Sequence, residues 1–221
     1  LTGVGAIFVS LMFGYVPDDA LNLTARYYAE NTVRDTGAAN IVAAIVVTFR
    51  GLDTLGEVTV LFLTAAIVGL VLAGSQQGRL RREQPAPGEL LVTGTRLLVP
   101  LTLLLGVYVF ANGHLTPGGG FQGGAILASA ILMLLLADPL REFSHRLISV
   151  IESISGLLFV AVGLLGMVYA GGFLDNRILP LGTLGDLISA GAIPVIYSFI
   201  GLKVGAEFSS MMVNLSETEE P

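Results

Sequence analysis

The sequence lacks cysteine altogether and contains only two histidines, His114 and His145, among its 221 residues. The absence of cysteine excludes disulfides, a cysteine nucleophile and thiolate ligands for a metal or an iron–sulfur cluster. With so few histidines, a histidine-rich metal or haem site is not expected either. No Ser/His/Asp arrangement, P-loop or dinucleotide-binding glycine motif is present. We therefore predict no catalytic residue, no metal and no cofactor in this chain.

Charged residues are also scarce, at 13%, whereas a soluble domain has about 25%. Hydrophobic residues make up 53% of the chain, and the mean hydropathy is +0.80. Such a chain cannot cover itself with polar surface, so we predict an integral membrane protein. Its charge-free runs are longer than the roughly 10-residue strands of membrane barrels, which favours helices. The net charge of −6 forms no basic face, so nucleic acid is not an expected partner.

A glycine-rich stretch at 112–124 interrupts the charge-free run 97–137, which is longer than the roughly 20 residues of one spanning helix. Pro117 removes a backbone donor, and Gly118, Gly119 and Gly120 adopt positive φ without steric cost. The stretch therefore predicts a tight turn between two spanning helices. Small residues at a spacing of four after the turn (Gly120, Gly124, Ala128) predict a close helix-packing face.

The pattern as a whole predicts an all-α integral membrane protein with about six transmembrane helices plus one short re-entrant or amphipathic helix. The spanning helices are expected at 1–16, 54–72, 90–111, 123–136, 147–169 and 193–213, and the short helix at 37–50. Asp53 is expected to cap the second spanning helix. The first run has no basic region before it, so we interpret it as a helix whose start is missing, not as a signal peptide.

A polar stretch rich in arginine and proline divides the chain into two membrane regions. The expected regions are 1–75, the linker 76–89, a four-helix region at 90–213 and an acidic tail at 214–221. The positive-inside rule places the linker arginines and the loop with Arg141 and Arg146 on the cytoplasmic side, together with the C-terminus. The glycine turn and the loop 171–186 then lie outside.

Arg50, Asp53 and Glu57 form one group of charges beside an apolar helix. A charge within a membrane helix costs about 2.5 to 3.5 kcal/mol on insertion scales, so each needs an explanation. One interpretation is helix capping, in which both carboxylates favour the positive helix N-terminus and Arg50 pairs with one of them. The other is that Glu57 is a protonatable relay group whose pKa is tuned by its two neighbours.

Lys203 and Glu207 form a second group, four residues apart on one helix face, which is an ion-pair spacing. They are either a self-neutralising pair or part of a proton-conducting helix. Glu152, near the start of its helix, is expected to have an interfacial or subunit-contact role. His114 lies in the glycine turn, where a lone histidine is usually solvated; the alternative is a role near an ion exit.

Two motifs resemble known families. Residues 49–57, FRGLDTLGE, look like a segment of the C-terminal region of the large A-type subunit of Mrp-type multisubunit Na⁺/H⁺ antiporters, which also occurs in the E-type subunit of membrane-bound hydrogenases. Residues 113–124, GHLTPGGGFQGG, resemble the turn of the B-type Mrp subunit, the MnhB family. The two resemblances cover roughly 1–75 and 90–213, so the chain is similar to a fusion of two neighbouring subunits.

The resemblance implies which residues of this chain occupy the functional positions of the two motifs. Glu57, with Asp53 and Arg50, takes the functional acidic position of the first motif. Pro117, Gly118, Gly119, Gly120 and Phe121 take the turn of the second. The first motif has aspartate where this chain has Thr48 and phenylalanine where it has Leu52, which removes one acidic group beside Arg50. Lys203 and Glu207 are not part of the pattern of the B-type antiporter subunit, and they hint at a module that serves a redox complex.

The implied function is that of a membrane subunit of an Mrp-type cation/proton antiporter module, contributing to Na⁺/H⁺ translocation and to assembly. Expected partners are the large antiporter-like subunits, the small C-, E-, F- and G-type subunits, the lipid bilayer and a hydrogenase or other redox arm. The expected location is the inner membrane of a prokaryote. The alternative is a non-conducting scaffold protein in the membrane arm of a hydrogenase or a related redox complex.

Overall fold

The computed structural model describes residues 2–14, 20–75, 87–139, 141 and 143–218, so most of the predicted linker 76–89 lies outside the described residues. Every regular element within these ranges is helical, which confirms the predicted all-α fold. The elements are α1 (Thr2–Gly14), α2 (Leu23–Thr36), α3 (Ile41–Ala44), η1 (Ile45–Phe49), α4 (Gly51–Ser75), α5 (Glu89–Ala111), α6 (Gly120–Ala137), α7 (His145–Tyr169), η2 (Asn176–Ile178) and α8 (Ile193–Thr218).

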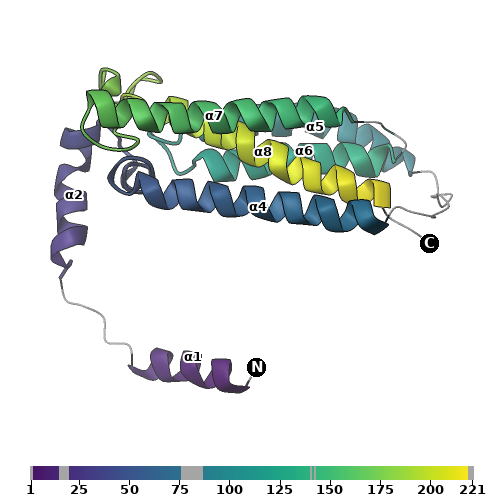
Figure 1. Cartoon of the computed structure of the whole chain (residues 1–221), viewed down its shortest axis with the longest axis horizontal. Coiled ribbons are helices and arrows are strands. Elements are labelled where there is room, and N and C mark those ends of the chain that lie inside the picture. Colours follow the sequence, from purple (N-terminus) through teal and green to yellow (C-terminus); the bar gives the residue numbers. More distant parts are fainter. Residues whose placement is uncertain (1, 15–19, 76–86, 140, 142, 219–221) are drawn as a thin grey trace.

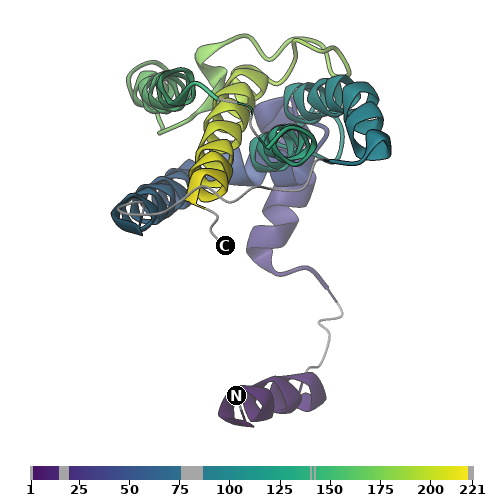
Figure 2. The same ribbon diagram turned by 90° about the vertical axis from the view of Figure 1, so that its right-hand side faces the viewer.

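Five long helices, α4 to α8, run side by side as a bundle, with α1 lying apart from it (Figure 1). Helix α8 is the centre, because it contacts α4, α5, α6 and α7. Figure 2 looks along the bundle and shows α8 between α4, α6 and α7. All residues of α1 from Gly3 to Gly14 are exposed, so the rest of the described chain does not cover this helix.

Four of the described helices are long and apolar enough to cross a membrane: α4 over Gly51–Leu72, α5, α6 and α7. The bent pair of α2 with Ile41–Phe49 makes a fifth if it is one span. Helix α1 has 13 residues and is shorter, and α8 has 26 residues but carries Lys203 and Glu207. The expected count of six spans is therefore approximate, although each expected apolar run forms a helix.

The chain bends by 83° between α2 and α3. Helix α2 ends at Gly37, whose φ of 70° lets its N–H donate to the Val33 carbonyl. Asn40 then starts α3, because its side-chain oxygen accepts from the N–H groups of Val42 and Ala43. The predicted single short helix at 37–50 was wrong in detail, since α3 passes directly into the π-helix η1. Helix α2 was not predicted.

Glycines let α6 lie close to both α5 and α8. A Cβ on Gly123 would lie 2.7 Å from the Gly106 carbonyl oxygen of α5, and one on Gly124 would lie 2.8 Å from the Gly201 carbonyl oxygen of α8. A Cβ on Gly120 would lie 2.5 Å from the Cβ of Ile200. The predicted small-residue face is thereby confirmed, with Ala128 buried on the same face.

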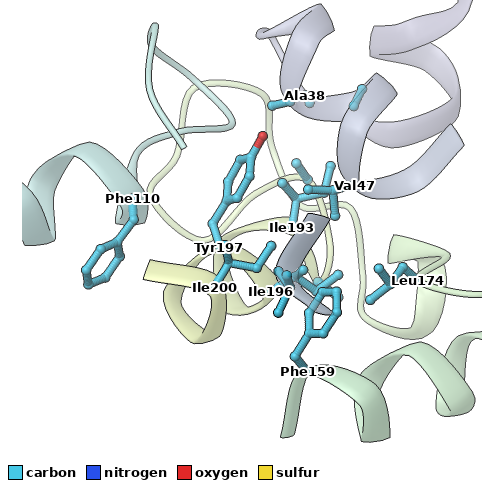
Figure 3. Close-up of a cluster of buried hydrophobic side chains, with 14 of the residues drawn as sticks. Ala38, Val47, Phe110, Phe159, Leu174, Ile193, Ile196, Tyr197 and Ile200 are labelled. Carbon is cyan, nitrogen blue, oxygen red and sulfur yellow. The ribbon is translucent and has the colours of Figure 1, made fainter. Parts of the chain in front are cut away.

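The main apolar core gathers around the first turns of α8 (Figure 3). Helix α8 begins at Ile193, as the sequence predicts, and continues to Thr218 instead of ending near Val213. Buried side chains from most of the bundle converge there, among them Val47, Phe110, Phe159, Leu174, Ile196 and Ile200. The start of α8 therefore fixes the positions of the surrounding helices.

Candidate ion-pathway residues

Lys203 and Glu207 form an ion pair inside the bundle. The Nζ atom of Lys203 lies 2.7 Å from Oε1 of Glu207, and the two side chains are 10% and 0% exposed. Their spacing of four residues places both on one face of α8, as the sequence predicts. At 1.5 Å per residue, Lys203 lies about 15 Å along α8 from Ile193, far from either end of the helix.

The helices on either side of α8 enclose this pair. Lys203 Nζ lies 4.9 Å from the centre of the Phe62 ring of α4, a cation–π contact. On α7, a Cβ added to Gly156 would lie 3.3 Å from Cδ and 3.4 Å from Nζ of Lys203. The missing side chain at position 156 is what leaves room for the lysine stem. The pair therefore depends on residues from both membrane regions of the chain.

Glu152 belongs to this group as well. It is half-buried on α7, one turn before Gly156, and it acts electrostatically on Glu207. Two acidic groups and one basic group therefore lie close enough on α7 and α8 to interact through their charges. Since the Oε2 atom of Glu207 has no hydrogen-bond partner among the described residues, one carboxylate oxygen is left to accept a proton or a cation.

Arg50 and Asp53 form a different kind of ion pair at the start of α4. Arg50 Nη2 lies 2.5 Å from Asp53 Oδ2, and the side chains are 60% and 53% exposed. Asp53 lies in the first turn of α4, which begins at Gly51, so the predicted N-cap role of Asp53 was wrong. A carboxylate within the first turn still favours the positive end of the helix.

Glu57 is exposed and forms no ion pair with a described residue. Phe62, which touches Lys203, is five residues further on and therefore about 140° around the helix from Glu57. Arg50, directly before α4, and Asp53 and Glu57 on it are all exposed and form a charged edge, which we call the outer edge of α4, while Phe62 faces the bundle. The structure brings together Arg50 with Asp53 and Lys203 with Glu207, but it does not join the two groups.

The π-helix η1 leads directly into this outer edge. The side chain of Thr54 donates to the Val46 carbonyl at 2.5 Å, across the junction between η1 and α4. The buried Oγ1 of Thr48 has no hydrogen-bond partner among the described residues. Single π-helical turns inside helical segments are frequent at functional sites. The resemblance to the first motif departs at Thr48, within this same turn.

The glycine turn packs its backbone against the ring of Tyr197. A Cβ on Gly113 would lie 2.9 Å from the ring, and one on Gly119 would lie 3.4 Å from it. Pro117 is exposed, and a Cβ on Gly118 would lie 2.7 Å from the Val109 carbonyl oxygen. Gly120 and Phe121 were predicted to lie in the turn but form the first turn of α6. The glycines of the turn are therefore needed because larger side chains would collide with Tyr197 and with the backbone of α5.

His114 is fully buried, so the expectation of a solvated histidine was wrong. Its Nε2 atom lies 3.3 Å from the Asp186 carbonyl oxygen, in the loop between α7 and α8. Burial lowers the pKa of His114, although the carbonyl contacts oppose this effect. The neutral imidazole therefore links the glycine turn to the α7–α8 loop.

Two asparagines complete this junction, and sequence reasoning missed both as functional residues. The amide of Asn40 donates to the carbonyls of Gly113 and Thr116, at 2.8 and 2.9 Å. The fully buried Asn176 donates to the carbonyls of Thr36 and Ala190, at 2.7 and 2.9 Å. The sequence could have identified Asn40 as a helix cap, since it directly precedes an apolar helical run. No sequence pattern identifies Asn176.

Asp175 and Arg177 hold the same loop from its other side. Arg177 donates to both carboxylate oxygens of Asp175 and to the Ala170 carbonyl. Burial raises the pKa of Asp175, but hydrogen bonds and charge from Arg177 outweigh it and hold that pKa below its usual value. No group of three or more metal-ligating side chains occurs within the part of the chain that the structure describes.

Comparisons with known proteins agree with both motifs. Residues 90–210 match the family model described as a domain related to the MnhB subunit of Na⁺/H⁺ antiporter, and residues 1–93 match the MbhE model, which describes the E-type subunit of MBH. The B-type subunit of the Na⁺/H⁺ antiporter of Bacillus subtilis is 38% identical over 97 residues, which cover 42% of this chain and 68% of that protein.

Two solved structures are also similar over nearly the whole chain. A chain of the membrane-bound sulfane sulfur reductase, an archaeal respiratory membrane complex, has 41% identity and a TM-score of 0.82, with 97% of each chain covered. A chain of the Mrp complex from Dietzia sp. DQ12-45-1b has 28% identity and a TM-score of 0.79; the match covers 99% of this chain but 25% of that one. This multi-pass membrane chain belongs to the family of domains related to the MnhB subunit of Na⁺/H⁺ antiporters, preceded by a segment that matches the MbhE family.

Proposed function

We propose that this chain is a membrane subunit of an Mrp-type cation/proton antiporter module, and that Lys203 and Glu207 lie on its ion pathway. Family membership supports the first statement. The buried ion pair supports the second, because a charged pair deep in a membrane bundle is costly and is found mainly where ions or protons move. The role in translocation rests on this one observation.

The chemistry of the pair suits a relay. Lys203 neutralises Glu207, and a proton or a Na⁺ ion that reaches the free carboxylate oxygen would compete with the lysine for the same charge. Hard cations prefer oxygen ligands such as this one. Lys203 would then turn toward Glu152, the second carboxylate of the group. A cation that enters at Glu207 would thereby shift the charge of Lys203 from one carboxylate of the group to the other.

The outer edge of α4 has a complementary role in this proposal. Arg50, Asp53 and Glu57 are exposed on the isolated chain, so they are available to a neighbouring protein of the complex. The proposed neighbours are the large antiporter-like subunits and the small C-, E-, F- and G-type subunits. The linker arginines and the C-terminus are proposed to face the cytoplasm in the inner membrane of a prokaryote, following the positive-inside rule.

A second candidate function is a non-conducting scaffold in the membrane arm of a redox complex. The match to the sulfane sulfur reductase complex favours it, since that chain corresponds to this one over 97% of its length. In this case the glycine packing face and the asparagine junction would be the functional features, and the buried ion pair would only fix the orientation of α8.

Glu207→Gln in the complete complex tests the two candidates. Sodium-driven proton movement would be measured in inverted membrane vesicles, and assembly by co-purification of the partner subunits. The matched control is Glu217→Gln, which removes a half-exposed carboxylate from the same helix, where it pairs with His145. Conduction predicts at least a roughly 10-fold loss of transport in Glu207→Gln with assembly intact, and near-normal transport in the control.

Unchanged transport in Glu207→Gln would overturn the role in conduction and support the scaffold. If Glu207→Gln fails to assemble, the charge-retaining Glu207→Asp decides instead. Transport that falls further than the amount of assembled complex supports conduction. Transport that falls only in proportion to assembly contradicts it.

A further inference from the structure

A cavity of about 370 Å³ lies between the start of α5 and the end of α6, away from the ion pair and from the glycine turn. Val92, Val99, Pro100 and Leu134 give it an apolar wall. Its polar side consists of Thr95 and Arg96 from α5, with Asp138 and Arg141 from the segment after α6. The cavity thus combines an apolar wall with a charged rim at one end of two membrane-spanning helices.

The rim has two arginines that the described chain does not neutralise. Neither Arg96 nor Arg141 forms an ion pair with a residue that the structure describes. Arg141 lies over the ring of Phe143, with 5.7 Å from its guanidinium carbon to the ring centre. Asp138 contributes one negative charge to the same lining, so the two arginines leave the rim with a net positive charge. Guanidinium groups bind phosphate oxygens through pairs of parallel hydrogen bonds.

Thr95 provides a second and independent observation. It is 3% exposed, it lines the cavity, and its hydroxyl has no hydrogen-bond partner within the described chain. Several helical threonines of this protein, among them Thr59, Thr64 and Thr102, donate to the carbonyl four residues earlier. A buried hydroxyl without a partner is unfavourable, so the hydroxyl of Thr95 is left for a ligand.

The position of the cavity indicates what kind of ligand that is. Arg96 lies about 10 Å along α5 from Glu89, at 1.5 Å per residue, and from there its long side chain can reach toward the head groups while its stem stays in the hydrocarbon. Basic pockets between membrane-spanning helices bind phospholipid head groups. A free phosphate ion would make no favourable contact with the apolar wall of Val99, Pro100 and Leu134, whereas an acyl chain would.

We propose that this cavity binds the head group of a membrane phospholipid. Arg96 and Arg141 hold its phosphate, and the Thr95 hydroxyl donates to a phosphate oxygen. One acyl chain lies along the apolar wall, and Asp138 accepts from a hydroxyl or an ammonium group of the head group. The site is independent of ion translocation, since it shares no residue with the Lys203–Glu207 group.

Native mass spectrometry of the full chain purified in detergent tests this site, with palmitoyl-oleoyl-phosphatidylglycerol titrated in. The test variant is Arg96→Gln with Arg141→Gln. The matched control is Arg146→Gln, which removes an exposed arginine from the same end of the bundle but outside the cavity. We expect the double variant to bind its tightest phospholipid at least about 10-fold more weakly, and Thr95→Val about 3-fold more weakly, with the control within about 2-fold of the unaltered chain.

Two further titrations separate the sources of the phosphate. Palmitoyl-oleoyl-glycerol, which has the acyl chains but no phosphate, is expected to bind no better to the unaltered chain than to the double variant. Inorganic phosphate at millimolar concentration is expected not to displace the phospholipid. The proposal is overturned if the double variant and the Arg146→Gln control retain phospholipid equally, or if inorganic phosphate competes for the site.

Discussion

The two groups of charge in this chain differ in their surroundings more than in their residues. Each contains a basic side chain and two carboxylates, yet the group on α8 and α7 is enclosed while the one on α4 is open. Lys203 and Glu207 are 10% and 0% exposed, against 60% and 53% for Arg50 and Asp53. Burial multiplies the strength of a charge interaction and the cost of breaking it, so similar residues have different energetic weight.

The comparison also shows which charged group the chain encloses by itself and which one it leaves uncovered. The chain itself encloses the Lys203–Glu207 pair, with Phe62 on one side and Gly156 on the other. The outer edge of α4 has no such cover among the described residues. A charged edge against lipid is costly, so this edge is the surface on which we expect a partner protein to bind.

The largest effect is expected from Lys203→Met. The substitution leaves Glu207 as an unpaired charge in the interior, which costs about 3 to 5 kcal/mol. The free energy of unfolding of the detergent-solubilised chain measures it. In the double variant Lys203→Met with Glu207→Met, both charges are gone and much of the loss should be regained. If the single variant is no less stable than the double variant, the pair is not buried as described.

A somewhat smaller effect is expected from Asn176→Leu, which keeps the number and branching of the side-chain heavy atoms but removes both donated hydrogen bonds. The carbonyls of Thr36 and Ala190 then each lose one hydrogen bond, at about 0.5 to 1.5 kcal/mol each, and the Ala190 carbonyl still accepts from the Ile193 N–H. Because this junction holds the first segment of the chain against the α7–α8 loop, α4 should lose part of its contact with α8. Thermal unfolding measures the loss, and Asn112→Ala, at an asparagine whose amide donates within its own helix, serves as the control.

The pH dependence of stability should reveal another buried titratable group, His114. Its folded-state pKa is lower than its ordinary value of 6.5, so it is neutral when folded and binds a proton more readily when unfolded. The contribution of neutral His114 to the free energy of unfolding is fully present above about pH 6.5. It is lost as the pH falls from there toward the lowered pKa. Unfolding followed from pH 8 to pH 5 should show this loss, and His114→Gln should abolish it. Equal slopes for both proteins would contradict the assignment.

The smallest effect is expected from Arg50→Gln. Exposed ion pairs contribute about 0 to 1 kcal/mol, so the isolated chain should be nearly as stable without this arginine. In the assembled complex we expect a larger effect, because a partner would bury the same edge. Co-purification of partner subunits should therefore fall while the stability of the free chain does not. A large loss of stability in the free chain would show that the edge is already enclosed.

The sequence predicted the helices that hydrophobic runs define, because length and lack of charge are enough to identify them. It also predicted the Lys203–Glu207 pair, since a spacing of four on one helix fixes the contact locally. It could not show that Phe62 and Gly156 enclose the pair, because these contacts join helices far apart in the chain. The burial of His114 was missed for the same reason, as the loop that covers it begins over fifty residues later.

Asn40 and Asn176 hold together stretches that match two different families. Asn40 and Thr36 lie in the part that matches the MbhE family, whereas Gly113, Thr116 and Asn176 lie in the MnhB-related part. None of these hydrogen bonds uses the covalent connection between the two parts. In a relative whose two parts are separate polypeptides, the same bonds would form a joint between subunits. The two matched parts of this chain are therefore joined by contacts that do not depend on the linker between them.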